Sequence, residues 1–190
     1  MKNVGALLAI AIATFMLTGC SHDQPTVERR GLTGFVVEAD YEKKRLLVVE
    51  SDETKQGEDY EAEWYTGNKD AVLLDSKSNP ALFTDVEVGF KVETWATLPS
   101  VQTYPSSTDL SRFVIADDVK HPHTSMLQKT AIQTVVTVTY VKNQNPPGTI
   151  IIQNVSTNET EWIIQAYHYN QEKGYRLAVH AETAEVREIS

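Results

Sequence analysis

The sequence contains one cysteine, Cys20, among its 190 residues. A single cysteine excludes an intramolecular disulfide and any zinc site built from several thiolates. The length allows one medium domain or two small ones, and it excludes a large multidomain enzyme. Cationic residues are also scarce, since 17 Lys and Arg stand against 26 Asp and Glu. Such a surface repels phosphate backbones and anionic headgroups, so we expect no nucleic acid among the partners.

The first nineteen residues nearly lack charge. Lys2 is their only charged residue, and it precedes an apolar stretch over 4–17. This stretch is too short for a membrane-spanning helix and has the length of the hydrophobic region of a signal peptide. It ends in a segment that resembles the bacterial lipobox, consisting of Leu17, Thr18, Gly19 and Cys20.

The lipobox resemblance implies a lipoprotein signal peptide over 1–19, with Leu17, Thr18 and Gly19 recognised by the signal peptidase. It implies that Cys20 becomes the lipidated first residue, carrying diacylglyceryl and acyl chains such as palmitate. Two or more acyl chains anchor a protein stably, because each buried methylene contributes about 0.8 kcal/mol. Residues 20–30 are polar beyond the cysteine and read as a tether. We therefore expect an extracytoplasmic protein whose partner is membrane lipid, anchored to the bacterial cell membrane through Cys20.

The first folded region, over 31–120, is rich in β-strand patterns. Two apolar runs over 34–39 and 45–50 flank a polar segment of hairpin length and predict an antiparallel pair. Residues 60–65 alternate, which places aromatic and apolar side chains on one face of a strand and leaves the other face to solvent. The apolar set is Tyr60, Ala62 and Trp64, and the solvated set is Glu61 and Glu63.

Further strands are predicted over 86–95, with a bend at Gly89, and over 112–116. Residues 76–80 are rich in turn formers, and 71–74 is the one short helix candidate. About five short strands at fairly regular spacing predict a small barrel or a sandwich.

Four segments of this region resemble a YobA-like family of lipoproteins from Gram-positive bacteria. They are Gly34-Phe35-Val36-Val37, Leu46-Leu47-Val48-Val49, Val88-Gly89-Phe90-Lys91-Val92 and Thr103-Tyr104-Pro105. The resemblance implies an OB-like barrel and a surface lipoprotein of no established activity. OB barrels bind ligands through aromatic residues on an exposed strand face. Trp95 and Tyr104 are therefore candidates for ligand binding, the alternative being that both pack in the core or cover its end.

A second region, over 124–190, follows a proline and histidine cluster at His121 to His123. Residues 125–142 fit either a helix, from the spacing of Leu127, Ala131 and Val135, or a strand, from the β-branched run over 135–141. Four strand candidates follow over 149–155, 161–169, 175–181 and 185–189.

The segment over 175–186 resembles the last strand and turn of a PepSY-type domain. Ala181, Thr183 and Val186 match that pattern, whereas His180 replaces its aspartate and Ala184 its turn glycine. The resemblance favours a helix from 125 to about 140. It implies a role in protease inhibition or envelope sensing.

The sequence has no nucleophile elbow, P-loop or dinucleotide glycine fingerprint. His121 and His123 lack a carboxylate or cysteine at ligand spacing, so we predict no metal site and no cofactor. The predicted fold class is α+β and mostly β: an OB-like barrel, then a helix with an antiparallel sheet. The predicted function is non-enzymatic binding of an envelope protein, peptide or glycan. Alternatives are an envelope hydrolase with an unrecognised site, which a polar pocket with close histidines and carboxylates would favour, and a protease inhibitor or sensor.

Overall fold

The computed structural model describes residues 27–52, 55, 60–101, 103–143 and 150–189. The predicted signal peptide, Leu17 to Cys20 and most of the tether lie outside these residues. Within them the chain is mostly β, with one α-helix, as the sequence predicts. No helix in this part of the chain is both long and apolar enough to cross a membrane.

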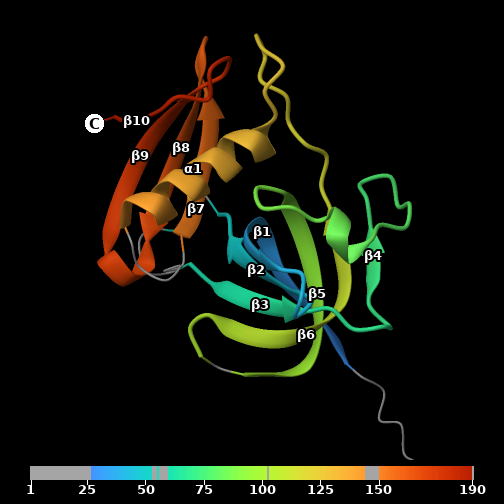
Figure 1. Cartoon of the computed structure of the whole chain (residues 1–190). Coiled ribbons are helices and arrows are strands. Elements are labelled where there is room, and N and C mark those ends of the chain that lie inside the picture. The colour runs from blue at the N-terminus through green and yellow to red at the C-terminus, as the bar shows by residue number, and fades with distance from the viewer. Residues whose placement is uncertain (1–26, 53–54, 56–59, 102, 144–149, 190) are drawn as a thin grey trace, which may run out of the picture.

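The first half of the chain forms a closed five-stranded barrel (Figure 1). Its strands follow one another around the wall in the order β1-β2-β3-β6-β5 and back to β1. All neighbours are antiparallel except β3 and β6, whose parallel pairing closes the barrel. This is the OB-like barrel that the resemblance implies, and it decides between the barrel and the sandwich that the strand pattern left open. The strand bounds are β1 (Glu28–Asp40), β2 (Arg45–Glu50), β3 (Ala62–Thr66), β5 (Lys91–Val101) and β6 (Ser106–Ile115).

Two predictions of secondary structure in this half are wrong. The helix predicted over 71–74 is instead a short strand, β4 (Val72–Leu74), which pairs in parallel with the end of β6. Four residues make barely one turn of an α-helix, whereas pairing with the edge of β6 satisfies the backbone groups of this segment. The strand predicted to start at 86 starts at Lys91, and Gly89 lies in the turn before it with a φ of +95°. A short 3₁₀ helix, η2 (Phe83–Asp85), precedes this turn.

The barrel interior holds inward-facing apolar side chains from all five strands. On β1 this set includes Val36, whereas its neighbours Phe35 and Val37 point out of the barrel. The buried interior residues are Leu32, Val36, Leu46, Val48, Tyr65, Val86, Val92, Ala96, Leu110 and Phe113.

Glu63 is also buried, which contradicts the prediction that it lies on a solvated face. Its side chain is 4% exposed and forms an ion pair of 2.6 Å with Arg29 from the start of β1. A buried carboxylate requires such a partner, because its desolvation is otherwise too costly. Both faces of β3 are therefore covered, since Tyr60 and Ala62 beside it are buried as well.

The second half of the chain consists of one helix and a four-stranded antiparallel sheet in the order β10-β9-β8-β7. Residues 125–142, which fit either a helix or a strand from the sequence, form mainly a helix. Ala131, Ile132, Val135 and Val136 are buried at helical spacing, while Gln133 and Thr137 are exposed. The bounds are α1 (Gln128–Asn143), β7 (Ile150–Thr157), β8 (Glu161–His168), the 3₁₀ helix η3 (Tyr169–Gln171), β9 (Lys173–His180) and β10 (Val186–Glu188).

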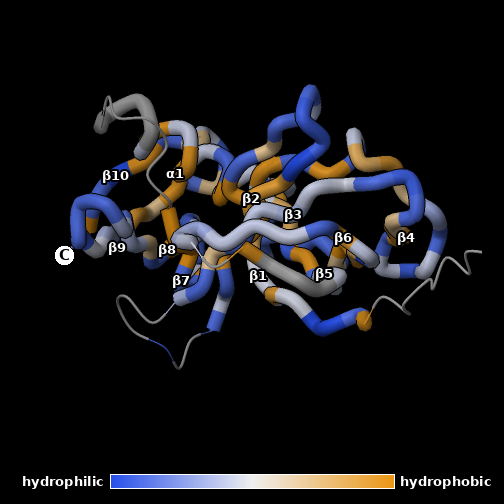
Figure 2. The backbone as a smooth tube through the Cα atoms, turned by 90° about the horizontal axis from the view of Figure 1, so that it is seen from below, coloured by the Kyte–Doolittle hydropathy of each residue, from blue (hydrophilic) through white to orange (hydrophobic). Residues whose placement is uncertain are grey.

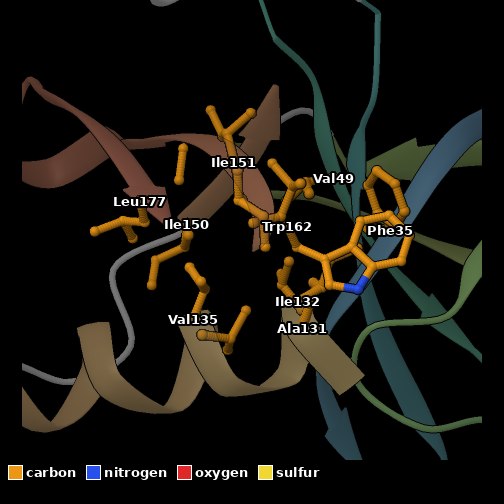
Figure 3. Close-up of a cluster of buried hydrophobic side chains, with 14 of the residues drawn as sticks. Phe35, Val49, Ala131, Ile132, Val135, Ile150, Ile151, Trp162 and Leu177 are labelled. Carbon is orange, nitrogen blue, oxygen red and sulfur yellow. The ribbon is translucent and has the colours of Figure 1, made fainter. Parts of the chain in front are cut away.

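The two halves share one buried core. Phe35 and Val49 project from the outer wall of the barrel toward Trp162 and Ile151 of the sheet, and the apolar face of α1 closes the cluster (Figure 3). Seen from below, the barrel and the helix-and-sheet half lie side by side, with hydrophobic stretches along their strands and hydrophilic turns around them (Figure 2). The hydrophobic effect that folds each half thus also joins them.

The turn between β9 and β10 contains the alanine that replaces the glycine of the PepSY-type pattern. Ala184 has a φ of +58°, and its N–H donates to the His180 carbonyl over 2.9 Å. This left-handed conformation costs an L-residue about 1–2 kcal/mol and glycine almost nothing.

We therefore expect Ala184→Gly to raise the free energy of unfolding by about 0.5–1 kcal/mol, after the greater entropy of glycine in the unfolded chain is subtracted. Urea denaturation would measure the change. Ala39→Gly, within β1, is the control and should lower stability by about 0.5–1 kcal/mol. A loss of stability in Ala184→Gly would contradict the prediction.

Candidate functional site

The face on which OB barrels usually bind their ligands is covered in this protein. That face is the outer side of the second and third barrel strands, together with adjoining loops. Here Leu47, Val49 and Ala62 occupy it, and each is at most 2% exposed because the second half of the chain packs over them. Trp64, at its margin, is half-buried, with the Arg45 guanidinium 4.4 Å from its ring centroid. This face is therefore closed to a ligand in the folded protein.

Trp95, a predicted ligand contact, lies on the opposite wall of the barrel. It is half-buried on β5, and the Arg112 guanidinium of β6 sits 3.8 Å from its ring centroid. Arg112 also lies 3.8 Å from the Glu28 carboxylate. One face of the indole is thus already occupied by a cation that belongs to the protein.

Tyr104, the second predicted ligand contact, lies in the loop between β5 and β6, and its peptide bond to Pro105 is cis. Its ring stacks on Tyr169 of η3, with centroids 3.9 Å apart and planes at 25°. Burial raises the pKa of the Tyr104 hydroxyl, and Tyr169 and Tyr167 raise it further. Instead of covering the end of the barrel core, the ring joins the barrel loop to the second half of the chain. Trp95 and Tyr104 thus have different partners.

His121 and His123 point in different directions. His121 is 1% exposed and contacts Trp162 edge-on, with ring centroids 5.6 Å apart, whereas His123 is exposed. The His121 Nδ1 accepts the backbone N–H of His123 over 3.2 Å, so a neutral His121 carries its proton on Nε2. That Nε2 has no hydrogen-bond partner among the described residues. Within the same residues, no three His, Cys, Asp or Glu side chains are placed to hold a metal ion.

Two hollows adjoin where the segment before α1 meets the turns of the sheet. The larger measures about 350 Å³ and the smaller about 180 Å³, and both are lined by Thr124 and Glu182. We call the pair the polar groove. The remaining lining residues are Ser125, Met126, Thr130 and Ala181 in the larger hollow, and His123, Glu159, Thr160 and His180 in the smaller.

Backbone hydrogen bonds fix the side chains of the groove. The His180 Nδ1 accepts the N–H groups of Glu182 and Thr183, each over 3.3 Å, so its Nε2 is the donor in the neutral ring. The Thr124 hydroxyl accepts the Met126 N–H over 3.3 Å. Among the described residues, no hydrogen bond links a hydroxyl of the groove to an imidazole.

The groove carries negative charge. Neither Glu159 nor Glu182 has an ion-pair partner in the described part of the chain. By contrast, Glu161 is held by Arg187 through bonds of 2.9 to 3.1 Å. A hydrogen bond from Asn158 and the Arg187 cation hold the pKa of Glu161 below its usual value.

This groove could not be predicted from local sequence patterns. Its residues come from three separate segments, over 123–130, 159–160 and 180–182, which only the folded chain brings together. These segments include the first turn of α1 and the end of β9. The one local signal was the cluster at His121 to His123, which was interpreted as a boundary. Comparison of the chain with models of protein families, with curated proteins and with solved structures finds no match.

Proposed function

We propose that this protein is a lipid-anchored, extracytoplasmic binding protein of a bacterial envelope, and that the polar groove is its recognition site. The observation that carries the proposal is the position of the groove. The turns that line it lie at the end of the molecule opposite the point where the chain enters β1 (Figure 1).

The proposed anchor and the groove are compatible in geometry. Glu28 follows Cys20 by eight positions, and an extended chain of eight residue steps spans at most roughly 30 Å. An acylated Cys20 would hold the barrel close to the bilayer, with the groove directed away from it. Because the usual OB face is covered, the groove offers a soluble partner a concave surface that the membrane does not obstruct.

The histidines and carboxylates of the groove are also the feature that would favour the hydrolase alternative. Nucleophilic catalysis requires a hydroxyl within about 2.6–3.2 Å of its base. The described hydrogen bonds instead commit His180 Nδ1 and the Thr124 hydroxyl to the backbone. This supports binding over hydrolysis. The helix followed by an antiparallel meander is also the order that the PepSY-type resemblance implies, so the bound partner could be a protease or a sensed peptide.

Cys20→Ser tests the anchor. The substitution removes the thiol that would accept the diacylglyceryl group, so we expect the protein to leave the membrane fraction or to accumulate as an unprocessed precursor. Cell fractionation and the mass of the N-terminal peptide would measure this. Ser21→Ala, one residue beyond the lipobox, is the control and should remain membrane-bound. A processed Cys20→Ser protein that stays in the membrane fraction would refute lipid anchoring through this residue.

A further inference from the structure

We infer that the polar groove binds a basic peptide segment, with an arginine side chain seated between Glu159 and Glu182. The inference rests on the proposed binding function and names the class of partner. Both carboxylates line the smaller hollow, and no lysine or arginine is among the lining residues of either hollow.

The carboxylates are available to a cationic guest. Their neighbour Glu161 is satisfied within the protein by Arg187 and Asn158, whereas Glu159 and Glu182 have no ion pair in the described structure. A guanidinium presents planar N–H donors that match carboxylate oxygens two at a time, and it stacks on aromatic rings. His123 and His180 line the same hollow and are its aromatic residues.

The groove also has donors for the carbonyl groups of a peptide. With Nδ1 accepting backbone N–H groups, the neutral His180 has its N–H on Nε2. The hydroxyl groups of Thr124, Ser125 and Thr130 line the larger hollow and add further donors.

The larger hollow can hold the methylene groups of the bound arginine side chain. Met126 and Ala181 line it together with three hydroxyl residues, Thr124, Ser125 and Thr130. Lysine and arginine side chains lay their methylene groups along such apolar surface while the charged end reaches polar groups. The smaller hollow therefore accepts the guanidinium of the arginine. The larger hollow accepts its methylene groups and the peptide backbone next to them.

The test uses residues 21–190, which contain every described element, and labelled peptides of equal length with a central Arg, Lys, Gln or Glu. Fluorescence anisotropy at physiological salt would measure binding. We expect the Arg peptide to bind most tightly and the Gln and Glu peptides to bind at least about tenfold more weakly. We expect the double variant Glu159→Gln/Glu182→Gln to bind the Arg peptide about tenfold or more weakly than the unchanged protein does.

The control is Glu42→Gln/Glu172→Gln, which removes the same charge at exposed positions outside the groove. Its affinity for the Arg peptide should stay within about twofold of that of the unchanged protein, because salt screens the attraction between charges separated by more than the Debye length. Equal loss in both double variants would overturn the inference and assign binding to net charge. If the Gln or Glu peptide bound as tightly as the Arg peptide and lost affinity in the groove variant, the partner would not be a basic peptide. The proposed binding function would still stand. Failure of every peptide to bind would refute the inference, whereas the anchor is judged separately through Cys20→Ser.

Discussion

Trp162→Ala lowers the free energy of unfolding by about 3–5 kcal/mol, the usual cost of deleting a buried aromatic ring. Trp162 is 2% exposed and lies between the barrel wall, at Phe35, and the helix, at Ala131 and Ile132 (Figure 3). Because a domain is stable by only about 5–15 kcal/mol, the variant loses a large fraction of its stability. Urea denaturation followed by circular dichroism and by hydrogen exchange measures the loss.

The location of Trp162 also predicts which parts of the fold lose protection from hydrogen exchange in this variant. Its side chain belongs to the core that both halves share, so the barrel and the sheet should lose protection from hydrogen exchange together. Trp95→Ala is the control, because this half-buried ring lies on the opposite barrel wall, outside both buried clusters, and should cost about 1 kcal/mol. A Trp162→Ala protein whose sheet melts while the barrel keeps full protection would show that the shared core does not couple the halves.

Most strands could be predicted from the sequence because their signals are local. The apolar runs over 34–39 and 45–50 and the polar turn between them specify an antiparallel hairpin, and β1 and β2 pair as expected. The ambiguous segment over 125–142 needed more than its β-branched residues. Its burial follows the helical spacing of Ala131, Ile132 and Val135, so packing against the sheet outweighs β propensity.

The errors arise where a residue's environment depends on distant parts of the chain. Alternation in β3 correctly separated Tyr60 and Ala62 from Glu63, but alternation cannot tell which face meets solvent when both are covered. Glu63 is buried because Arg29, 34 positions earlier, closes over it. The closure of the barrel through β3 and β6 and the assembly of the groove from three separate segments are equally nonlocal.

This nonlocality also explains why the predicted ligand contacts and the groove differ. Trp95 and Tyr104 were selected because aromatic residues on an OB barrel often meet ligands. In the structure, Arg112 covers one face of Trp95, and Tyr169 stacks on Tyr104. A role for either ring in binding remains a prediction, whereas the groove combines two carboxylates that have no ion pair among the described residues with the His180 donor.

Gly89→Ala is the second substitution with a large expected effect, a loss of more than about 2 kcal/mol. The residue has a φ of +95°, which costs an L-side chain about 1–2 kcal/mol. In addition, an added Cβ would lie 2.2 Å from the carbonyl oxygen of Lys129, in the first turn of α1. Since that neighbour is backbone, relief requires the helix to move away from the barrel.

The cost of Gly89→Ala should therefore appear at the junction of the two halves. Hydrogen exchange should accelerate in the first turn of α1 before it accelerates in the barrel interior. Gly174→Ala is a matched control, because an added Cβ there meets no atom within 4 Å, and its stability should change by less than about 1 kcal/mol. If Gly89→Ala were as mild as Gly174→Ala, the close approach of this turn to α1 would not be a constraint, and the glycine shared with the YobA-like pattern would need another explanation.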